Sequence, residues 1–302
     1  MSQAHQTTIA KRTTLQGVGL HSGRFTSMTL IPAGAYQGIV FVRSDVAQAE
    51  KIIPARWDNV VDTRLCTVVG NAEGVTVGTI EHLMSALCGC GIDNVIIEID
   101  GPEVPVMDGS AMPFVEAIEA AGMKTLAAPR RAIRVMREVT IEKDGKSATL
   151  KPADGSIYGG EIEFGHAEIG RQTFKTSLLN GNFRHDIAQA RTFGFLHEVE
   201  VLRTQGLALG GSMDNAIVLG DDKVLNPSGL RFADEFIRHK LLDAIGDLYL
   251  AGAQIMGEYH GVKAGHALNN DLLHALFASD ENWEWAETSE STAAGERLRR
   301  AA

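Results

Sequence analysis

Apolar residues between positions 231 and 251 recur at the spacing of an α-helix, and polar residues interrupt the face that they define. The apolar positions are Phe232, Phe236, Ile237, Leu241, Ala244, Ile245 and Leu248. His239, Asp243 and Asp247 follow one another at intervals of four residues, so a helix aligns them along one face. A histidine and a carboxylate one turn apart can bind one divalent ion, and a catalytic ion needs a further protein ligand. The segment therefore predicts a helix that carries part of a metal site.

A second helical pattern, TIEHLMSALCG at residues 79–89, supplies candidates for the missing ligand and for a base. Thr79 is a favourable N-cap residue, and Gly91 is expected to end the helix. Glu81 and His82 are adjacent, which places a candidate proton acceptor next to a candidate ligand. The H-E-x-x-H pattern is absent, so the common helix of zinc peptidases is not present.

Strand and turn patterns surround these helices. In the first half we expect short strands within 7–70, a buried strand at 95–99, a loop at 101–110, a helix at 112–121 and a linker at 127–131. In the second half we expect strands at 132–142, 147–151 and 157–164, helices at 186–190 and 231–251, a further strand and loop, and a last helix at 270–278. The polar residues from Asp280 onwards are expected to form a tail.

The two halves share a weak internal similarity. The pattern E-H-x6-G at 81–89 matches R-H-x6-G at 238–246, and a strand follows each. We therefore predict an α+β fold of two related domains, each a β-sheet layered against helices, packed face to face with the active site between them. The expected bounds are 1–126 for the first domain, 127–279 for the second and 280–302 for the polar tail.

Composition and charge narrow the classes of function. Hydrophobic residues make up 44% of the chain, enough for a core, and the formal net charge of −10 argues against a nucleic-acid partner. The N-terminal segment has no apolar run typical of a secretory signal. Asp243 and Asp247 interrupt the most apolar stretch, 241–256, so we expect no transmembrane segment.

The three cysteines fit a protein of a reducing compartment. Cys88 and Cys90 form a C-G-C pattern that also occurs in metal or redox pairs, but buried small residues near the end of a helix are the favoured interpretation. We expect the chain to act in the cytoplasm as a monomer.

Each candidate ligand has a structural alternative. A lone histidine is more often a hydrogen-bonded core residue than a ligand, but His82 and His239 occupy matching positions on two helices, beside ionisable residues. Asp243 lies on a helix face otherwise suited to the core, where a carboxylate must be paired or coordinated. Asp247 lies one turn further along, where it is better placed to orient another histidine.

His266, in KAGHALNN, is the candidate for that other histidine. Gly261 and Gly265 predict a flexible loop around it, and the simple alternative is a surface histidine. The acidic stripe favours a protonated imidazole, which is a general acid. Lys240 follows His239 on a neighbouring face, where it is either a surface lysine or a contact for an anionic group of a substrate.

Long motifs, present in a fixed order, connect the chain to a known family. They are GVGLHSG, EHLMSALCGCGIDNVIIEI, PVMDGSAMPFVEAI, ARTFGFL, LGGSMDNAIVL, LRFADEFIRHKLLDAIGDL and KAGHALNN. In these motifs the chain resembles the UDP-3-O-acyl-N-acetylglucosamine deacetylases of lipid A biosynthesis, from about residue 7 to residue 278. The resemblance implies a zinc-dependent amidohydrolase of two domains, with a small-molecule acylated UDP-sugar as its substrate.

The resemblance also implies roles for individual residues. Zinc ligands fall on His82, His239 and Asp243, and the general base falls on Glu81. The general acid falls on His266, and its orienting partner falls on Asp247. The oxyanion contact falls on Thr192, and the substrate-binding lysine falls on Lys240. Residues beside the site or in the insert that forms the acyl passage are Leu20, His21, Phe193, Leu202, Leu207 and Met213.

The implied reaction removes acetate from the 2-acetamido group of a UDP-sugar that carries a 3-O-acyl chain, an early committed step of lipid A synthesis. Two histidines and one aspartate leave an open position on a zinc ion for chemistry. Glu81 would accept a proton from water, and His266 would protonate the leaving nitrogen. Two other classes stay open: an amidase for a different acylated sugar or peptide, and a metal or lipid carrier without turnover.

Overall fold

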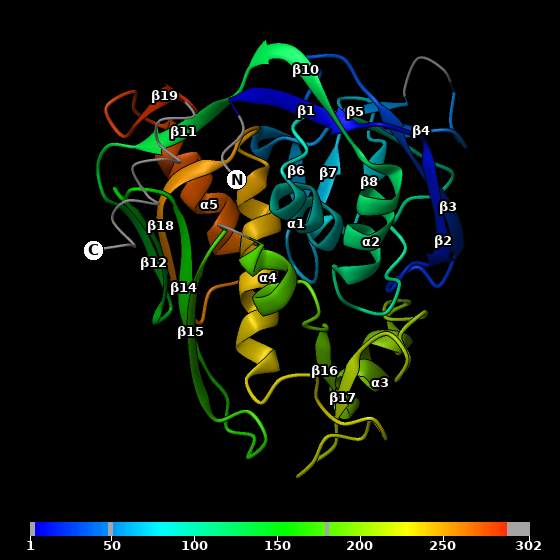
Figure 1. Cartoon of the computed structure of the whole chain (residues 1–302). Helices are drawn as coiled ribbons and strands as arrows, with labels where there is room; N and C mark the ends of the chain where they lie inside the picture. The colour runs from blue at the N-terminus through cyan, green and yellow to red at the C-terminus, as the bar shows by residue number, and fades with distance from the viewer. Residues whose placement is uncertain (1–3, 48–50, 179–180, 289–302) are drawn as a thin grey trace.

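Two large β-sheets enclose a layer of helices in the computed structural model, which describes residues 4–47, 51–178 and 181–288 (Figure 1). The longest described helix, α4 (Glu235–Tyr249), lies in the middle beside α1 (Glu81–Cys90). All residues of α4 except Arg238 and Lys240 are buried. The polar stripe that the sequence predicts therefore lies inside the protein. No described helix combines the length and apolar character needed to cross a membrane.

The first half of the chain forms a five-stranded sheet. Its strands lie in the order β2 (Thr13–Val18), β3 (Phe25–Pro32), β9 (Val95–Ile99), β4 (Ile39–Arg43) and β5 (Ile52–Pro54). A short 3₁₀ turn, η1, and a three-stranded sheet follow: η1 (Trp57–Asn59), β6 (Val60–Asp62), β7 (Val68–Gly70) and β8 (Thr76–Val77). The most buried positions of β9 alternate along the strand, so one face of the sheet rests on α1 and α2 (Met112–Ala121) (Figure 1).

The second half of the chain forms a seven-stranded sheet. Its main path runs β12 (Val139–Lys143), β13 (Lys146–Lys151), β18 (Ile255–Val262), β11 (Arg131–Val135) and β19 (Trp283–Glu287). Two further strands join through β18: β14 (Ser156–Glu163), which pairs with it in parallel, and β15 (Arg171–Ser177), which pairs with β14. Helix α5 (His266–Phe277) packs against α4 and against this sheet.

Two smaller units complete the described fold at opposite ends of the molecule (Figure 1). At one end, β1 (His5–Ile9) pairs with β10 (Met123–Pro129). At the other end, an insert joins the parallel strands β16 (Phe193–Phe195) and β17 (Ile217–Leu219) through α3 (Leu196–Thr204). A π-helical turn, η2 (Phe183–Ile187), precedes this insert.

The central helices approach each other backbone to backbone. A Cβ atom at Gly246 of α4 would lie 2.0 Å from the carbonyl oxygen of Glu81 in α1, so a glycine is needed there. This contact places Glu81 and His82 directly against α4. Gly89, the matching glycine of the first half, makes room for the ring of Phe183, whose nearest carbon lies 2.1 Å from the ideal Cβ position. Both glycines of the internal repeat therefore serve close packing.

Two boundary predictions are wrong because distant strands pair with the segments concerned. Residues 127–131, predicted as a linker, include the end of β10 and the first residue of β11, with only Arg130 between the two strands. The tail predicted from Asp280 includes β19, which pairs antiparallel with β11. Residues 289–302, the rest of that predicted tail, lie outside the described residues. Backbone hydrogen bonds to partners far away in the sequence override a local polar pattern.

Some helices and strands lie elsewhere than the local sequence pattern predicts. The predicted loop around His266 is the first turn of α5, with Gly265 as its N-cap residue, and Gly261 lies inside β18. The helix predicted at 186–190 is wrong, because the π-turn η2 ends at Ile187 and no helix continues to residue 190. Strand β15 and helix α3 were not predicted. By contrast, β9 and α2 occupy the predicted residues 95–99 and 112–121.

We expect Gly246→Ala to destabilise the protein by about 1–3 kcal/mol, because α1 and α4 must shift apart to admit a methyl group. Gly34→Ala is the matched control, since no atom lies within 4 Å of its Cβ position. Urea unfolding of the two variants measures the difference. Equal midpoints would contradict the close crossing of the helices.

Candidate active site

Three side chains predicted as metal ligands meet where α1 and α4 cross. The ligand atoms of His82, His239 and Asp243 lie within 4.8 Å of one another. Each of these residues is at most 3% exposed. The Nε2 atoms of His239 and His82 lie 3.3 and 3.6 Å from Oδ1 of Asp243. Two nitrogens and one oxygen therefore surround a common centre.

The surrounding hydrogen bonds leave these atoms available to a metal. Nδ1 of His239 donates to the carbonyl oxygen of Ala190 at 3.0 Å, which leaves the lone pair on Nε2. Burial lowers the pKa of His239 to about 3, so its ring is neutral, as a metal ligand must be. Oδ1 of Asp243 is buried without a hydrogen-bond partner among the described residues, which is costly unless a cation binds there. The donor set fits one divalent metal ion.

Lys240 balances part of the negative charge of the cluster. Its Nζ donates to Oδ2 of Asp243 at 2.9 Å, and 28% of its side chain is exposed. Burial alone would raise the pKa of Asp243, but His239 and Lys240 outweigh this effect and hold the pKa well below its usual range. Lys240 is therefore bound to a ligand carboxylate, and its exposed part faces a pocket.

Glu81 lies beside the cluster with one carboxylate oxygen fixed. Its Oε2 accepts a hydrogen bond from the backbone N–H of Thr67 at 3.1 Å. Its Oε1 lies 4.0 Å from Nε2 of His266. Burial raises the pKa of Glu81, although His266 and His82 oppose the shift. A buried carboxylate of raised pKa is a stronger base than an exposed one.

His266, whose side chain is 11% exposed, pairs with the buried Asp247 opposite Glu81. Nδ1 of His266 donates to Oδ2 of Asp247 at 2.9 Å. Burial alone would lower the pKa of His266, but Asp247 more than compensates, by its charge and by this hydrogen bond, and the pKa rises to about 9. His266 is therefore an imidazolium at neutral pH, with Nε2 directed to the side of Glu81.

Thr67 and Asn269 belong to this network and were missed from the sequence. Oγ1 of Thr67 donates to Oδ1 of Asp247 at 2.5 Å, so Thr67 contacts both Glu81 and Asp247. Asn269 donates to Oδ2 of Asp247 at 2.9 Å and accepts a hydrogen bond from Tyr259. No local pattern marks Thr67, because its partners are 14 and 180 residues away.

Phe193 lies at the edge of the cluster, and Thr192 precedes it in the chain. The N–H of Thr192 donates to the carbonyl oxygen of Gly109 at 2.8 Å, and Thr192 is the second residue after Ala190, which binds His239. The ring centroid of Phe193 lies 6.3 Å from that of His239 and 5.6 Å from Nζ of Lys240. The insert thus begins beside the metal ligands.

An apolar pocket of about 480 Å³ lies between the insert and the first half of the chain. Leu202 and Leu207 of the insert line it, together with His21. Leu20 does not line this pocket, but its carbonyl oxygen accepts a hydrogen bond from Gly210 of the insert. Met213 also lies outside the lining and is 50% exposed.

Glu103 anchors the loop that carries His21. Its carboxylate accepts hydrogen bonds from the N–H groups of His21 and Ser22, each at 2.8 Å. Thr79 donates its hydroxyl to the same carboxylate, so the predicted N-cap role of Thr79 is wrong, and Ile80 is the N-cap residue of α1. Burial lowers the pKa of His21, whose ring nitrogens have no hydrogen-bond partner among the described residues.

A second pocket, of about 450 Å³, lies beside the exposed part of Lys240. Its ionisable lining residues are Arg64, Lys143, Asp144, Lys146, Lys240 and His266. Lys240 and His266 are paired with Asp243 and Asp247, and Arg64 is paired with Asp62. The charge left to the pocket comes from Lys143 and Lys146 against Asp144, and this excess of positive charge favours an anionic group.

Comparison with known proteins assigns the chain to a protein family. Residues 6–278 match a family described as UDP-3-O-acyl N-acetylglycosamine deacetylase. A UDP-3-O-acyl-N-acetylglucosamine deacetylase of Phenylobacterium zucineum is 50% identical over 278 residues, which cover 92% of this chain and 95% of the relative. A protein of the same name from Shewanella baltica is 49% identical over 281 residues, or 92% of each chain.

We expect His266 to remain protonated through neutral pH and to lose its charge only as the pH rises through about 9. Asp247→Asn should lower this midpoint, because burial then acts without the opposing carboxylate. Histidine NMR titration of the metal-free protein measures both midpoints. An unchanged midpoint in the variant would show that Asp247 does not hold the charge.

Proposed function

Because the chain belongs to the family of UDP-3-O-acyl-N-acetylglucosamine deacetylases, we propose that it hydrolyses the 2-acetamido group of a UDP-3-O-acyl-N-acetylglucosamine and releases acetate. This reaction is an early committed step of lipid A synthesis. One observation carries the proposal: a buried set of metal-ligand atoms adjoins both a carboxylate base and a charged imidazole. Amide hydrolysis uses all of these groups, whereas a metal or lipid carrier needs neither base nor acid.

Zinc is the ion that we assign to His82, His239 and Asp243. Two imidazole nitrogens and one carboxylate oxygen are typical of catalytic zinc sites, which keep one position open. Bound there, zinc would act as a Lewis acid toward the amide carbonyl and would favour loss of a proton from water. The hydrogen bonds from His239 to Ala190 and from Lys240 to Asp243 aim the ligand atoms at the centre.

The proton transfers fall to Glu81 and His266. Glu81 accepts the proton of the attacking water at Oε1, since Oε2 is held by the N–H of Thr67. His266 donates a proton from Nε2 to the leaving nitrogen, while Asp247 holds Nδ1 and keeps the ring charged. The hydroxyl of Thr192 is our candidate donor to the developing oxyanion.

The two pockets fit the two ends of such a substrate. The cationic pocket beside Lys240 suits the diphosphate, because guanidinium and ammonium groups bind phosphate oxygens by charge-assisted hydrogen bonds. The apolar pocket lined by Leu202 and Leu207 suits the acyl chain. Phe193, the first residue of the insert, lies beside the metal ligand His239, where the sugar and the acyl ester would meet.

We also propose two related domains, 1–126 and 127–279, in a monomer that acts in the cytoplasm. The five-stranded sheet is built from residues before the division, and the seven-stranded sheet is built from residues after it. Two features qualify these bounds: β1 pairs with β10, which spans the division, and β19 extends the second unit past residue 279.

The direct test is acetate release from the acylated UDP-sugar by the zinc-loaded protein. Glu81→Ala and His266→Ala should each keep zinc and lower the rate by roughly 10²–10⁴, since each removes one proton transfer. The rate should follow a bell-shaped curve in pH. Its basic limb should report the loss of the His266 proton, at a pKa that Asp247 raises above the usual 6.5. Its acidic limb should report Glu81, whose pKa is raised above the usual 4.5 by burial.

A His266→Ala variant with unchanged rate and pH profile would exclude His266 as the acid and leave both transfers to Glu81. Wild-type protein that hydrolyses amides lacking UDP equally well would favour an amidase of different specificity. Wild-type protein that binds zinc but releases no acetate would favour a carrier.

A substitution in the lining of the apolar pocket tests whether the pocket binds the acyl chain. Leu202→Ala should weaken use of the acylated substrate by about 1 kcal/mol, or roughly fivefold in kcat/KM, because buried methylene contacts are lost. It should leave a substrate without the acyl chain, already a poor one, unaffected. Leu196→Ala is the matched control, since Leu196 is also in α3 but is 41% exposed and lies outside the pocket lining. Equal turnover of acylated and deacylated substrates would contradict the assignment.

A further inference from the structure

Glu235 extends the polar stripe of α4 by one turn. It precedes His239 by four residues, just as His239 precedes Asp243, so one face of the helix carries all of them. Its exposed fraction is 0%. A carboxylate buried so completely must be paired. The proposed reaction uses the other members of the stripe but leaves Glu235 without a role.

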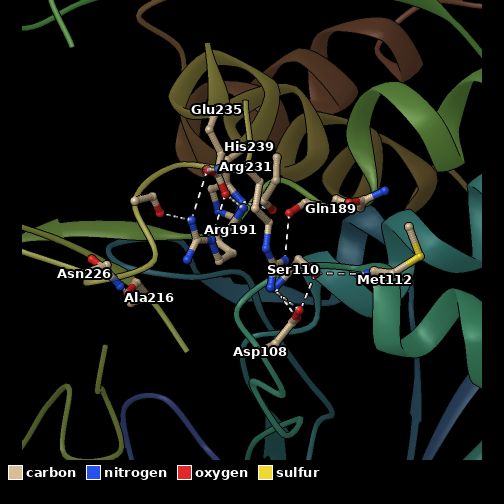
Figure 2. A network of polar contacts seen from close by, with 12 residues as sticks. Asp108, Ser110, Met112, Gln189, Arg191, Ala216, Asn226, Arg231, Glu235 and His239 are labelled. Atoms are coloured by element: carbon tan, nitrogen blue, oxygen red, sulfur yellow. Dashed lines mark hydrogen bonds and ion pairs between the residues drawn. The ribbon is translucent and has the colours of Figure 1, made fainter. Parts of the chain in front are cut away.

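Arg191 is the partner of Glu235. Its Nε donates to Oε1 of Glu235 at 2.9 Å, and its Nη2 donates to Oε2 at 3.2 Å. The backbone N–H of Arg191 also donates to Oε1, at 3.0 Å. The N–H of Arg231 donates to Oε2 at 2.6 Å. Figure 2 shows the carboxylate among these groups, so Glu235 binds the chain at Arg191 as well as its side chain.

Arg191 lies between two residues of the site. Ala190, before it, provides the carbonyl oxygen that accepts the Nδ1–H of His239, and Thr192 follows it. Helix α4 therefore makes two hydrogen bonds to the backbone of the 190–192 segment. Glu235 accepts one from the N–H of Arg191, and His239, one turn later, donates one to the carbonyl oxygen of Ala190. Because one rigid helix carries both contacts, the first sets the position of the carbonyl oxygen for the second.

Arg231 braces the same segment from outside. Its Nη1 donates to the carbonyl oxygen of Gln189 and its Nη2 donates to Oδ2 of Asp108, each at 2.9 Å (Figure 2). Asp108 in turn accepts hydrogen bonds from the N–H and hydroxyl of Ser110, just before α2. The segment is thus held on two sides by described residues.

We propose that Arg191 and Glu235 are a positioning pair for the metal centre. They hold the 190–192 segment so that Ala190 keeps the proton of His239 on Nδ1 and leaves Nε2 to the metal. A carbonyl oxygen only accepts hydrogen bonds, so a fixed carbonyl selects this tautomer, and such outer partners typically change metal affinity 10- to 100-fold. The inference rests on the metal site of the proposed function. The contrasting view is an ion pair that serves stability alone.

A double substitution separates these views. Arg191→Met with Glu235→Leu removes both buried charges together, and exchanges of this kind are often neutral in stability. It also removes the carboxylate that binds the N–H of Arg191. The matched control is Arg130→Met with Asp93→Leu. In that pair the Arg130 side chain is also buried, the Asp93 side chain is 14% exposed, and the two lie 2.8 Å apart. Asp93 also accepts a backbone N–H, that of Thr7.

The measurements are the zinc dissociation constant, by competition with a chelating dye, and the unfolding midpoint of the metal-free protein. We expect the Arg191/Glu235 double variant to stay folded, with a midpoint lowered by the two unpaired N–H groups of Arg191 and Arg231, and to bind zinc 10- to 100-fold more weakly. The control double variant should bind zinc as tightly as the wild type. A folded Arg191/Glu235 double variant with wild-type zinc affinity would overturn the proposal.

Glu235→Gln keeps the test decisive if the double variant does not fold. The amide keeps the shape of the side chain but loses the charge and one acceptor, so zinc affinity should fall and the defect should persist in folded protein. Wild-type zinc affinity in Glu235→Gln would again overturn the proposal. His239→Ala is the reference for loss of the site. If it binds zinc as tightly as the wild type, the metal site itself is wrong, which is a different failure.

Discussion

The close crossing of α1 and α4 is the constraint on which the site depends. His82 comes from the first turn of α1, and His239 and Asp243 come from α4, so the ligand atoms meet only if the two helices nearly touch. Gly246 permits this because a side chain there would overlap the carbonyl oxygen of Glu81. The same contact sets Glu81 beside the ligands. The glycine of the internal repeat is therefore part of the geometry of the chemistry.

Burying many ionisable groups close together costs free energy unless each group is paired. A group that is left unpaired therefore marks a position where a ligand binds. Glu235 is matched by Arg191 and Asp247 by His266, while Asp243 is matched by Lys240 on only one of its oxygens. Among the described residues, Oδ1 of Asp243 is the one buried carboxylate oxygen without a hydrogen-bond partner. That oxygen faces the two histidines, where a cation would complete the pairing.

The sequence predicts the parts of the site that share one helix. A four-residue period identifies the stripe of α4, and the same period would have added Glu235 had it been followed one turn back. A local pattern cannot reveal partners that meet through the fold. Thr67, Glu103 and Arg191 contact residues 14 to 180 positions away, so they carry no signal of their own.

Strand boundaries failed for a related reason. The pairing of β19 with β11 and of β10 with β1 depends on which edges the folded sheets leave open. The local composition of β19, with its two tryptophans among glutamates, does not indicate a partner. By contrast, β9 and α2 were located correctly, because each carries an apolar pattern of the right period between clear breaks.

Diffraction at the zinc absorption edge from crystals of the zinc-loaded protein tests the central claim most directly. The account predicts one anomalous peak per chain between α1 and α4, about 2.0–2.2 Å from Nε2 of His82, Nε2 of His239 and Oδ1 of Asp243. A peak at any other position, or none at these atoms in protein that releases acetate, would contradict it.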